Sequence, residues 1–258
     1  MKIAVLIKQV PDHEALVRVK SEQELDIENR YVCSFFDEIA IEAALNIRKN
    51  HPESEITAIS AGGKKAVDAL RRAVALGIDQ VEHLGDESLE MADNCYLAYV
   101  LAERLKAIQP DLIICGKQAG DDDFAATGPM VAEYLNIPHV SAVVSLGSDA
   151  DANQVTLGRE VEGEIWYLES NFPLLITAEK GLAEPHVPVV MRVMKAMRAQ
   201  IPGIPLNELD LKDKKQQGRL RRLRYTVPPE RADVAMMREP YPQNAAELIE
   251  HLKKNGVI

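Results

Sequence analysis

The chain has 258 residues, a hydrophobic content of 47% and a formal net charge of −10. Its length and hydrophobicity suffice for a full core and exclude global disorder. The acidic balance and the aromatic content of 5% argue against general nucleic-acid binding, which needs basic side chains and stacking rings. Three cysteines without metal-ligand spacing predict reduced thiols, and no segment reaches the roughly 20 apolar residues of a membrane span. We expect a cytoplasmic protein without direct membrane insertion.

Strands and helices alternate along the first part of the chain. The apolar run 3–10 predicts a buried first strand that ends at Pro11, and the polar stretch 13–32 predicts a loop or a small hairpin. Ser34 is a candidate N-cap, and Gly77 is a candidate helix stop. We expect helices over 36–47, 64–76, 89–108 and 127–135, and strands over 55–61, 80–84, 111–115, 140–146, 154–161, 164–168 and 174–178.

This alternation predicts one α/β domain over 1–183. Strand–helix–strand units favour an open, mostly parallel, Rossmann-like sheet with right-handed crossovers, and the successive strands after Val140 predict an antiparallel extension. The remainder has no strong strand pattern, apart from a short amphipathic helix over 245–254. Because so long a segment with little core of its own is not stable alone, we expect 201–258 to be an arm that lies on this domain or on a partner.

The stretch 116–129, GKQAGDDDFAATGP, follows a buried strand and opens a helix. Ligands of open α/β sheets bind at this carboxyl end of the strands, and the N–H groups of the following helix favour phosphate. Gly116 and Gly120 permit close backbone approach. The adjacent Asp121, Asp122 and Asp123 would repel a phosphate, so they face ribose hydroxyls, solvent or the helix N-terminus. An acidic capping turn without ligand and a divalent-metal site also remain open.

Familiar catalytic motifs are missing from the sequence. It contains no GxGxxG fingerprint, no GxxxxGK[ST] loop, no GxSxG and no recognisable Ser-His-Asp set, and its six histidines are scattered without metal-ligand spacing. The turns after the first and second strands lie at the same expected sheet edge as the acidic stretch. The pattern therefore indicates a nucleotide-binding protein rather than a self-contained catalyst.

Four stretches, in order along the chain, resemble the family of electron transfer flavoprotein β subunits. They are VLIKQVPD at 5–12, GKQAGDDDFAATG at 116–128, REVEGE at 159–164 followed by FPLLITA at 172–178, and the pair 184–185 with MKA at 194–196. Each stretch alone is moderately specific, and the ordered set is highly so. The resemblance implies an adenine nucleotide alpha hydrolase-like fold and an electron carrier rather than an enzyme.

The resemblance also implies partners and cofactors. Such a subunit forms a heterodimer with an α subunit, which holds most of an FAD site. The pair accepts electrons from dehydrogenases of the acyl-CoA type, as in fatty acid β-oxidation, and passes them to a quinone oxidoreductase or another acceptor. The β subunit holds AMP, or a second FAD in electron-bifurcating members. A stand-alone adenine-nucleotide-binding protein stays an alternative.

Carried onto this chain, the resemblance implies a nucleotide site at three strand ends and one helix start. Its residues are Leu6, Lys8, Ser34, Phe35, Phe36, Asp37, Ala61, Gly116, Lys117, Gln118, Ala119, Gly120, Asp121, Asp122, Asp123, Ala125, Ala126 and Thr127. His13 is implied as a contact of the flavin held by the α subunit. Ser34-Phe35 replaces a common Asn-Pro, Ala125-Ala126 replaces Asn-Gln, and Gly120 replaces a branched residue. These losses of side-chain donors leave AMP, FAD and a weak or empty site open.

The segment 184–200 is implied to be a recognition loop for the dehydrogenase. Val190 or Met191 would insert into the partner, flanked by Arg192, Met194 and Lys195, although a core helix is the alternative. The arm 201–258 would pack on the α subunit. Its run 212–224 has seven basic residues and one acidic residue, which fits a solvated or subunit-facing arm better than a nucleic-acid site.

Overall fold

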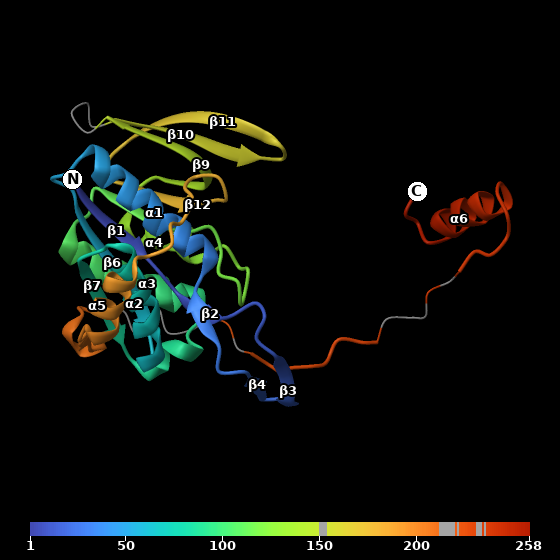
Figure 1. The fold of residues 1–258 in the computed structure, drawn as a ribbon, viewed down its shortest axis with the longest axis horizontal. Coiled ribbons are helices and arrows are strands. Elements are labelled where there is room, and N and C mark those ends of the chain that lie inside the picture. The colour runs from blue at the N-terminus through green and yellow to red at the C-terminus, as the bar shows by residue number, and fades with distance from the viewer. Residues whose placement is uncertain (150–153, 212–219, 221, 231–233, 235) are drawn as a thin grey trace.

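The computed structural model describes residues 1–149, 154–211, 220, 222–230, 234 and 236–258. Its centre is a nine-stranded sheet in the order β11-β10-β9-β12-β8-β1-β6-β7-β13 (Figure 1). The strands are β1 (Lys2–Leu6), β6 (Glu55–Gly62), β7 (Gln80–Gly85), β8 (Leu112–Gly116), β9 (His139–Asp149), β10 (Gln154–Val161), β11 (Glu164–Asn171), β12 (Leu174–Ala178) and β13 (Gly203–Ile204). In this spatial order, the seven strands β9, β12, β8, β1, β6, β7 and β13 pair in parallel with their neighbours. At the other end of the sheet, β10 pairs antiparallel with β9 and with β11. The predicted α/β sheet with an antiparallel extension is confirmed.

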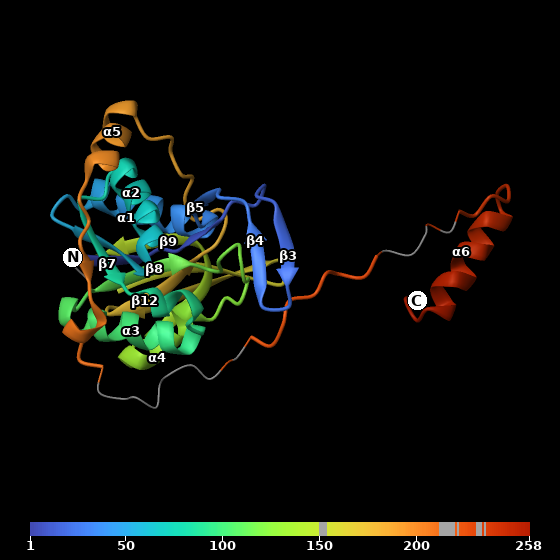
Figure 2. The ribbon, with the colours of Figure 1, turned by 90° about the horizontal axis from the view of Figure 1, so that it is seen from below.

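Helices cover both faces of the sheet (Figure 2). One layer contains α1 (Phe35–Asn50) and α2 (Val67–Leu76), and the other contains α3 (Asn94–Ile108) and α4 (Thr127–Leu135). The central strand β1 shows why: Ile3 and Val5 pack in the core under α1 and α2, whereas Ala4 and Leu6 pack in the core under α3 and α4. Successive side chains of a strand point to opposite faces, so an uninterrupted apolar strand needs both layers.

The expected first strand over 3–10 is wrong in its second half. β1 ends at Leu6, and the short β2 (Gln9–Pro11) pairs instead with β5 (Tyr31–Cys33). The reason lies in the backbone N–H of Lys8, which donates to a side chain of α1 rather than to a neighbouring strand. Between β2 and β5, β3 (Val17–Ser21) and β4 (Glu24–Ile27) form the hairpin that the sequence allowed.

Two expected helix starts also differ. The helix expected over 89–108 begins only at Asn94, because the Asp93 side chain accepts the N–H of Tyr96, and a 3-10 turn, η2 (Glu87–Met91), precedes it. The helix expected over 64–76 begins with a 3-10 turn, η1 (Lys64–Ala66). Gly77 ends it with a φ of 122°, a conformation that suits glycine.

The last part of the chain leaves the sheet in stages. α5 (Val190–Arg198) lies on α2, and then β13 pairs with β7, with the 3-10 turn η3 (Leu206–Glu208) following. Leu206, Leu209 and Leu211 are partly buried against the core under α3 and α4. The predicted C-terminal helix is confirmed as α6 (Gln243–Lys254), which lies apart from the sheet and its helices in both views (Figures 1 and 2). None of the described helices is long and apolar enough to cross a bilayer.

Candidate functional site

The carboxyl ends of β1, β6 and β8 meet at one edge of the sheet. Leu6 stands in register with Ile59 of β6 and with Cys115 of β8, so the chain segments that follow these strands emerge side by side. The start of α1 reaches the same edge, since the N–H of Ser34 donates to the carbonyl of Lys8. The structure thus brings together the first-strand turn, the start of α1 and the glycine that opens the acidic loop.

Asp37 joins these three segments. Its buried carboxylate accepts the backbone N–H of Lys8 at 2.7 Å and that of Gly116 at 2.8 Å. Burial raises the pKa of Asp37 to about 7, against the opposing effect of the two N–H donors and the Lys8 ammonium. The carboxyl group therefore changes its protonation state near neutral pH, at the centre of the candidate site.

Glycine is required beside this carboxylate. A Cβ at Gly116 would overlap Asp37 Oδ1 and lie 2.8 Å from the Cβ of Phe36. Gly128, in the first turn of α4, meets a similar limit, because a Cβ there would lie 2.7 Å from Cys115 Sγ. The two glycines hold α1 and α4 close to the carboxyl end of β8.

The acidic loop between β8 and α4 folds over Lys8. The ammonium of Lys8 lies 2.8 Å from Asp121 Oδ1 and 3.0 Å from Asp122 Oδ2. Burial opposes the charge of Lys8, but the two carboxylates prevail and raise its pKa. Asp123 has a φ of 52° and accepts the Gln118 amide at 2.8 Å. The three carboxylates are therefore held by this chain's own donors.

The other residues expected in the loop have different surroundings. Lys117 points toward β12, where its ammonium pairs with Glu179, while Ala125 has a φ of 51° and leads into α4 at Thr127. Gly120 has open space around it. Within the part of the chain that the structure describes, no group of three or more His, Cys, Asp or Glu side chains could hold a metal ion.

Sequence reasoning missed two contributors to this edge, Phe124 and Ser60. Phe124 is exposed in the acidic loop, as Phe35 is at the start of α1, although large aromatic side chains are usually covered. Ser60, near the end of β6, has a buried hydroxyl without a hydrogen-bond partner among the described residues, and so does Ser34. The one signal for Phe124 in the sequence was the presence of an aromatic residue within the polar stretch DDDFAA.

These residues fit an adenine nucleotide. Buried hydroxyls without partners favour a polar ligand or water nearby, because such groups cost free energy when unpaired. The first turn of α4 carries no acidic residue, so its N–H groups are free of a competing carboxylate there. The carboxylates of the acidic loop are acceptors for hydroxyl groups, and the exposed rings of Phe35 and Phe124 offer faces for a base.

His13 lies shortly after the end of β2. Its imidazole is almost fully exposed and lies 3.5 Å from the carboxylate of Asp12. The imidazole of His13 is thus open to solvent, and its implied contact with a flavin stays a prediction.

A second surface is formed by α5. The side chains of Val190 and Met191 are 74% and 78% exposed, and Met194 is also exposed. Lys195 lies beside Met191 and Met194 along a shallow hollow. Arg192 reaches back toward α2 and donates to the carbonyl of Leu76 at 3.3 Å. Ala196 is the one buried residue of this helix, which favours an exposed helix over the alternative of a core helix.

Comparison with known proteins places this fold and these motifs in one family. A family model described as "Electron transfer flavoprotein domain" matches residues 27–209. The chain is 32% identical over 265 residues to the mitochondrial electron transfer flavoprotein subunit beta of Arabidopsis thaliana, with 100% of both chains covered. It is 29% identical over 262 residues to the Bacillus subtilis subunit beta, with 100% of both covered. With the Megasphaera elsdenii subunit beta it shares 37% identity over 199 residues, 74% of this chain and 73% of that one. The chain belongs to the electron transfer flavoprotein family.

Proposed function

We propose that this chain is the β subunit of a heterodimeric electron carrier. The heterodimer accepts electrons from flavin dehydrogenases of the acyl-CoA type and delivers them to a quinone oxidoreductase or another acceptor. The full-length similarity to proteins named subunit beta supports this assignment. The observation that carries it is the convergence of two strand ends, at Lys8 and Gly116, and the start of α1 on the buried carboxylate of Asp37.

The ligand of this edge is AMP in our proposal. The first-turn N–H groups of α4 and the hydroxyl of Thr127 take the phosphate, while the acidic loop accepts hydrogen bonds from the ribose hydroxyls. Because Asp121 and Asp122 already bind the Lys8 ammonium, the charge that faces the phosphate is lower than the three consecutive acids imply. The loop therefore tolerates a monophosphate.

The α subunit supplies the surface for the arm and most of the FAD site. α6 has no buried residue, and its Leu248 and Ile249 are exposed on an amphipathic helix. A 12-residue helix of this kind is marginal in water without a packing partner. In our proposal it packs on the α subunit, and His13 lies near the flavin held there. FAD supplies the redox chemistry when bound, and this chain contributes binding and orientation.

The dehydrogenase docks on α5. Val190 and Met191 present apolar side chains to solvent, and Lys195 adds a positive charge beside them. An exposed apolar row that is flanked by charge is typical of a protein–protein contact. The cations steer an acid-rimmed partner, and the apolar anchor provides the desolvated contact.

One measurement tests the nucleotide assignment. The chain is co-purified with its α subunit, the complex is denatured, and the released small molecules are separated by chromatography and quantified per heterodimer. One AMP and one FAD are expected. As a matched comparison, the same analysis is made on a Gly116→Ala complex, in which the edge is distorted and AMP, but not FAD, is expected to be depleted.

Other outcomes assign different functions. Two FAD per heterodimer would make the protein an electron-bifurcating member of the family. One FAD without a second nucleotide would contradict the β-subunit site. A stable nucleotide-bound monomer that binds no flavin-holding partner in gel filtration would instead identify a stand-alone nucleotide-binding protein.

A further inference from the structure

The exposed helix α5 has little apolar packing to hold it. Only Ala196 of its residues is buried, at 2% exposure, whereas Val190, Met191 and Met197 are mostly exposed. A nine-residue helix does not hold its shape in water without tertiary contacts. Something other than a hydrophobic seam must therefore fix the direction in which α5 presents its apolar row.

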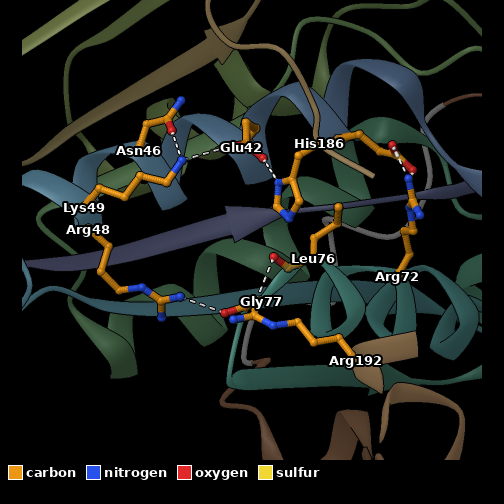
Figure 3. A network of polar contacts seen from close by, with 10 residues as sticks. Glu42, Asn46, Arg48, Lys49, Arg72, Leu76, Gly77, His186 and Arg192 are labelled. Carbon is orange, nitrogen blue, oxygen red and sulfur yellow. Dashed lines mark hydrogen bonds and ion pairs between the residues drawn. The ribbon is translucent and has the colours of Figure 1, made fainter. Parts of the chain in front are cut away.

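A cavity of about 530 Å³ lies between α1, α2 and the chain that leads into α5. Its apolar walls are Leu45, Leu76 and Val189, and its polar lining includes Glu42, His186 and Arg192. The packing of side chains is thus interrupted where the segment 184–200 meets the layer of α1 and α2. Polar side chains cross this gap from both sides (Figure 3).

The first bridge joins the segment before α5 to α1. His186 Nδ1 contacts the carboxylate of Glu42, which is buried in α1 and also lies 3.4 Å from the ammonium of Lys49 (Figure 3). A buried carboxylate is costly unless it is paired, so the folded chain favours the arrangement in which His186 stays in place.

The second bridge joins α5 to the C-terminal end of α2. Arg192 Nη1 donates to the carbonyl of Leu76 at 3.3 Å, and Arg48 of α1 donates to the next carbonyl, that of Gly77, at 2.7 Å (Figure 3). The last carbonyls of a helix lack partners within the helix and carry a partial negative charge. Two guanidinium groups from two different elements thus satisfy them.

Gly77 makes room for the second bridge. Its φ of 122° turns the chain away from α2, and a Cβ at this position would overlap Arg192 Nη1. The helix stop and the anchor of α5 are therefore one structural feature.

We propose that His186 and Arg192 are positioning residues that hold α5 on α2 and so set the orientation of its apolar row. The orientation of α5 affects docking of the dehydrogenase only if α5 is the docking surface, so this part of the inference rests on the proposed function. Arg192 acts through its contact with α2 rather than by touching the dehydrogenase, which separates it from Lys195 on the same helix.

Hydrogen exchange on the FAD-loaded heterodimer tests the placement directly. Arg192→Gln and His186→Leu are each expected to speed backbone exchange in 184–199 by about tenfold, because each removes a hydrogen bond that involves a charged group. Arg192→Lys restores part of the protection. Arg104→Gln is the matched control: it breaks the bidentate pair with Glu82, at 2.6 and 2.7 Å, on the other helical layer, and leaves 184–199 unchanged.

The docking role is tested with reduced acyl-CoA dehydrogenase as electron donor. Arg192→Gln is expected to raise the KM for the heterodimer about fivefold to tenfold, because the competent orientation is populated less often, while kcat and the flavin potential stay unchanged. Unchanged exchange in 184–199 in both variants would overturn the inference. Faster exchange, with a KM that neither Arg192→Gln nor Val190→Asp alters, would support the placement and overturn α5 as the docking surface.

Discussion

The proposed nucleotide edge, where Lys8, Asp37 and Gly116 meet, and the helix α5 are built by opposite means. At the edge, one buried carboxylate ties β1, β8 and α1 together, and glycine is needed because no space remains. At α5, the chain crosses a cavity and exposes its apolar side chains. A tightly packed interior fixes the geometry for a small ligand, whereas an exposed, lightly anchored helix keeps its contact surface available to another protein.

The largest expected effect comes from closing the space at the proposed nucleotide edge. Gly116→Ala places a methyl group against the carboxylate of Asp37. Because this carboxylate cannot move without losing its two N–H donors, the free energy of unfolding is expected to fall by about 2–3 kcal/mol. Gly120→Ala is the control, because a Cβ at Gly120 meets nothing within 4 Å. Urea titration compares the two, and equal stabilities would contradict the tight packing of this edge.

The buried carboxylate predicts a pH dependence. Because the pKa of Asp37 rises from 3.8 to about 7 on folding, the folded chain binds more protons than the unfolded chain in this interval. The contribution of Asp37 to stability therefore falls as the pH rises from about 4 to about 7, and is constant above that. Asp37→Asn removes this dependence, although its amide cannot accept both N–H groups.

Urea titration of wild type and Asp37→Asn at several pH values measures the difference. The variant is expected to gain about 2.5 kcal/mol relative to wild type between about pH 5 and pH 8. A difference that stays constant with pH would show that Asp37 is ionised throughout.

A smaller effect is expected where the acidic loop folds over Lys8. In a double-mutant cycle, Lys8→Met and Asp121→Asn are expected to couple by about 0.5–1 kcal/mol at low salt, because the Lys8 side chain is 36% exposed and solvent screens the pair. High salt should reduce the coupling. The exposed Lys20–Glu24 pair serves as the control. Additive changes at both pairs would mean that the loop is not held by Lys8.

The smallest effect on stability is expected at α5. Val190→Asp changes a side chain that is 74% exposed, so the free energy of unfolding should stay within about 0.5 kcal/mol of wild type. In the assay with the proposed dehydrogenase as electron donor, the KM for the heterodimer should nevertheless rise at least about tenfold, since a charge replaces an apolar anchor. A large loss of stability would show that α5 belongs to the core.

Most of the α/β sheet and its helices could be predicted from the sequence, because the strands are apolar runs that glycine or proline residues separate. The LIIC segment of β8 and the helix 127–135 show this best. The break after Leu6 could not be predicted, since the partner of the Lys8 N–H comes from Asp37, 29 positions away. The helix expected from 89 failed for a local reason: Asp93 caps the helix later than the apolar pattern indicated.

The candidate site was predictable in its position but not in its contacts. Strand ends and glycines indicated the edge, whereas the Lys8–Asp121 pair spans 113 positions and has no local signal. At α5, the sequence indicated an apolar, basic segment. The contact of Arg192 with the carbonyl of Leu76 could not be predicted, because it depends on where the end of α2 lies relative to α5 in the folded chain.

The separation of α6 from the sheet has a consequence for the life of the protein in the cell. In the proposed heterodimer the α subunit covers the apolar side of α6, so a chain made without it carries this helix uncovered, and such helices open readily. Proteases and chaperones act on segments of this kind. In our proposal, α6 is therefore the first segment that proteolysis removes from a chain without its α subunit.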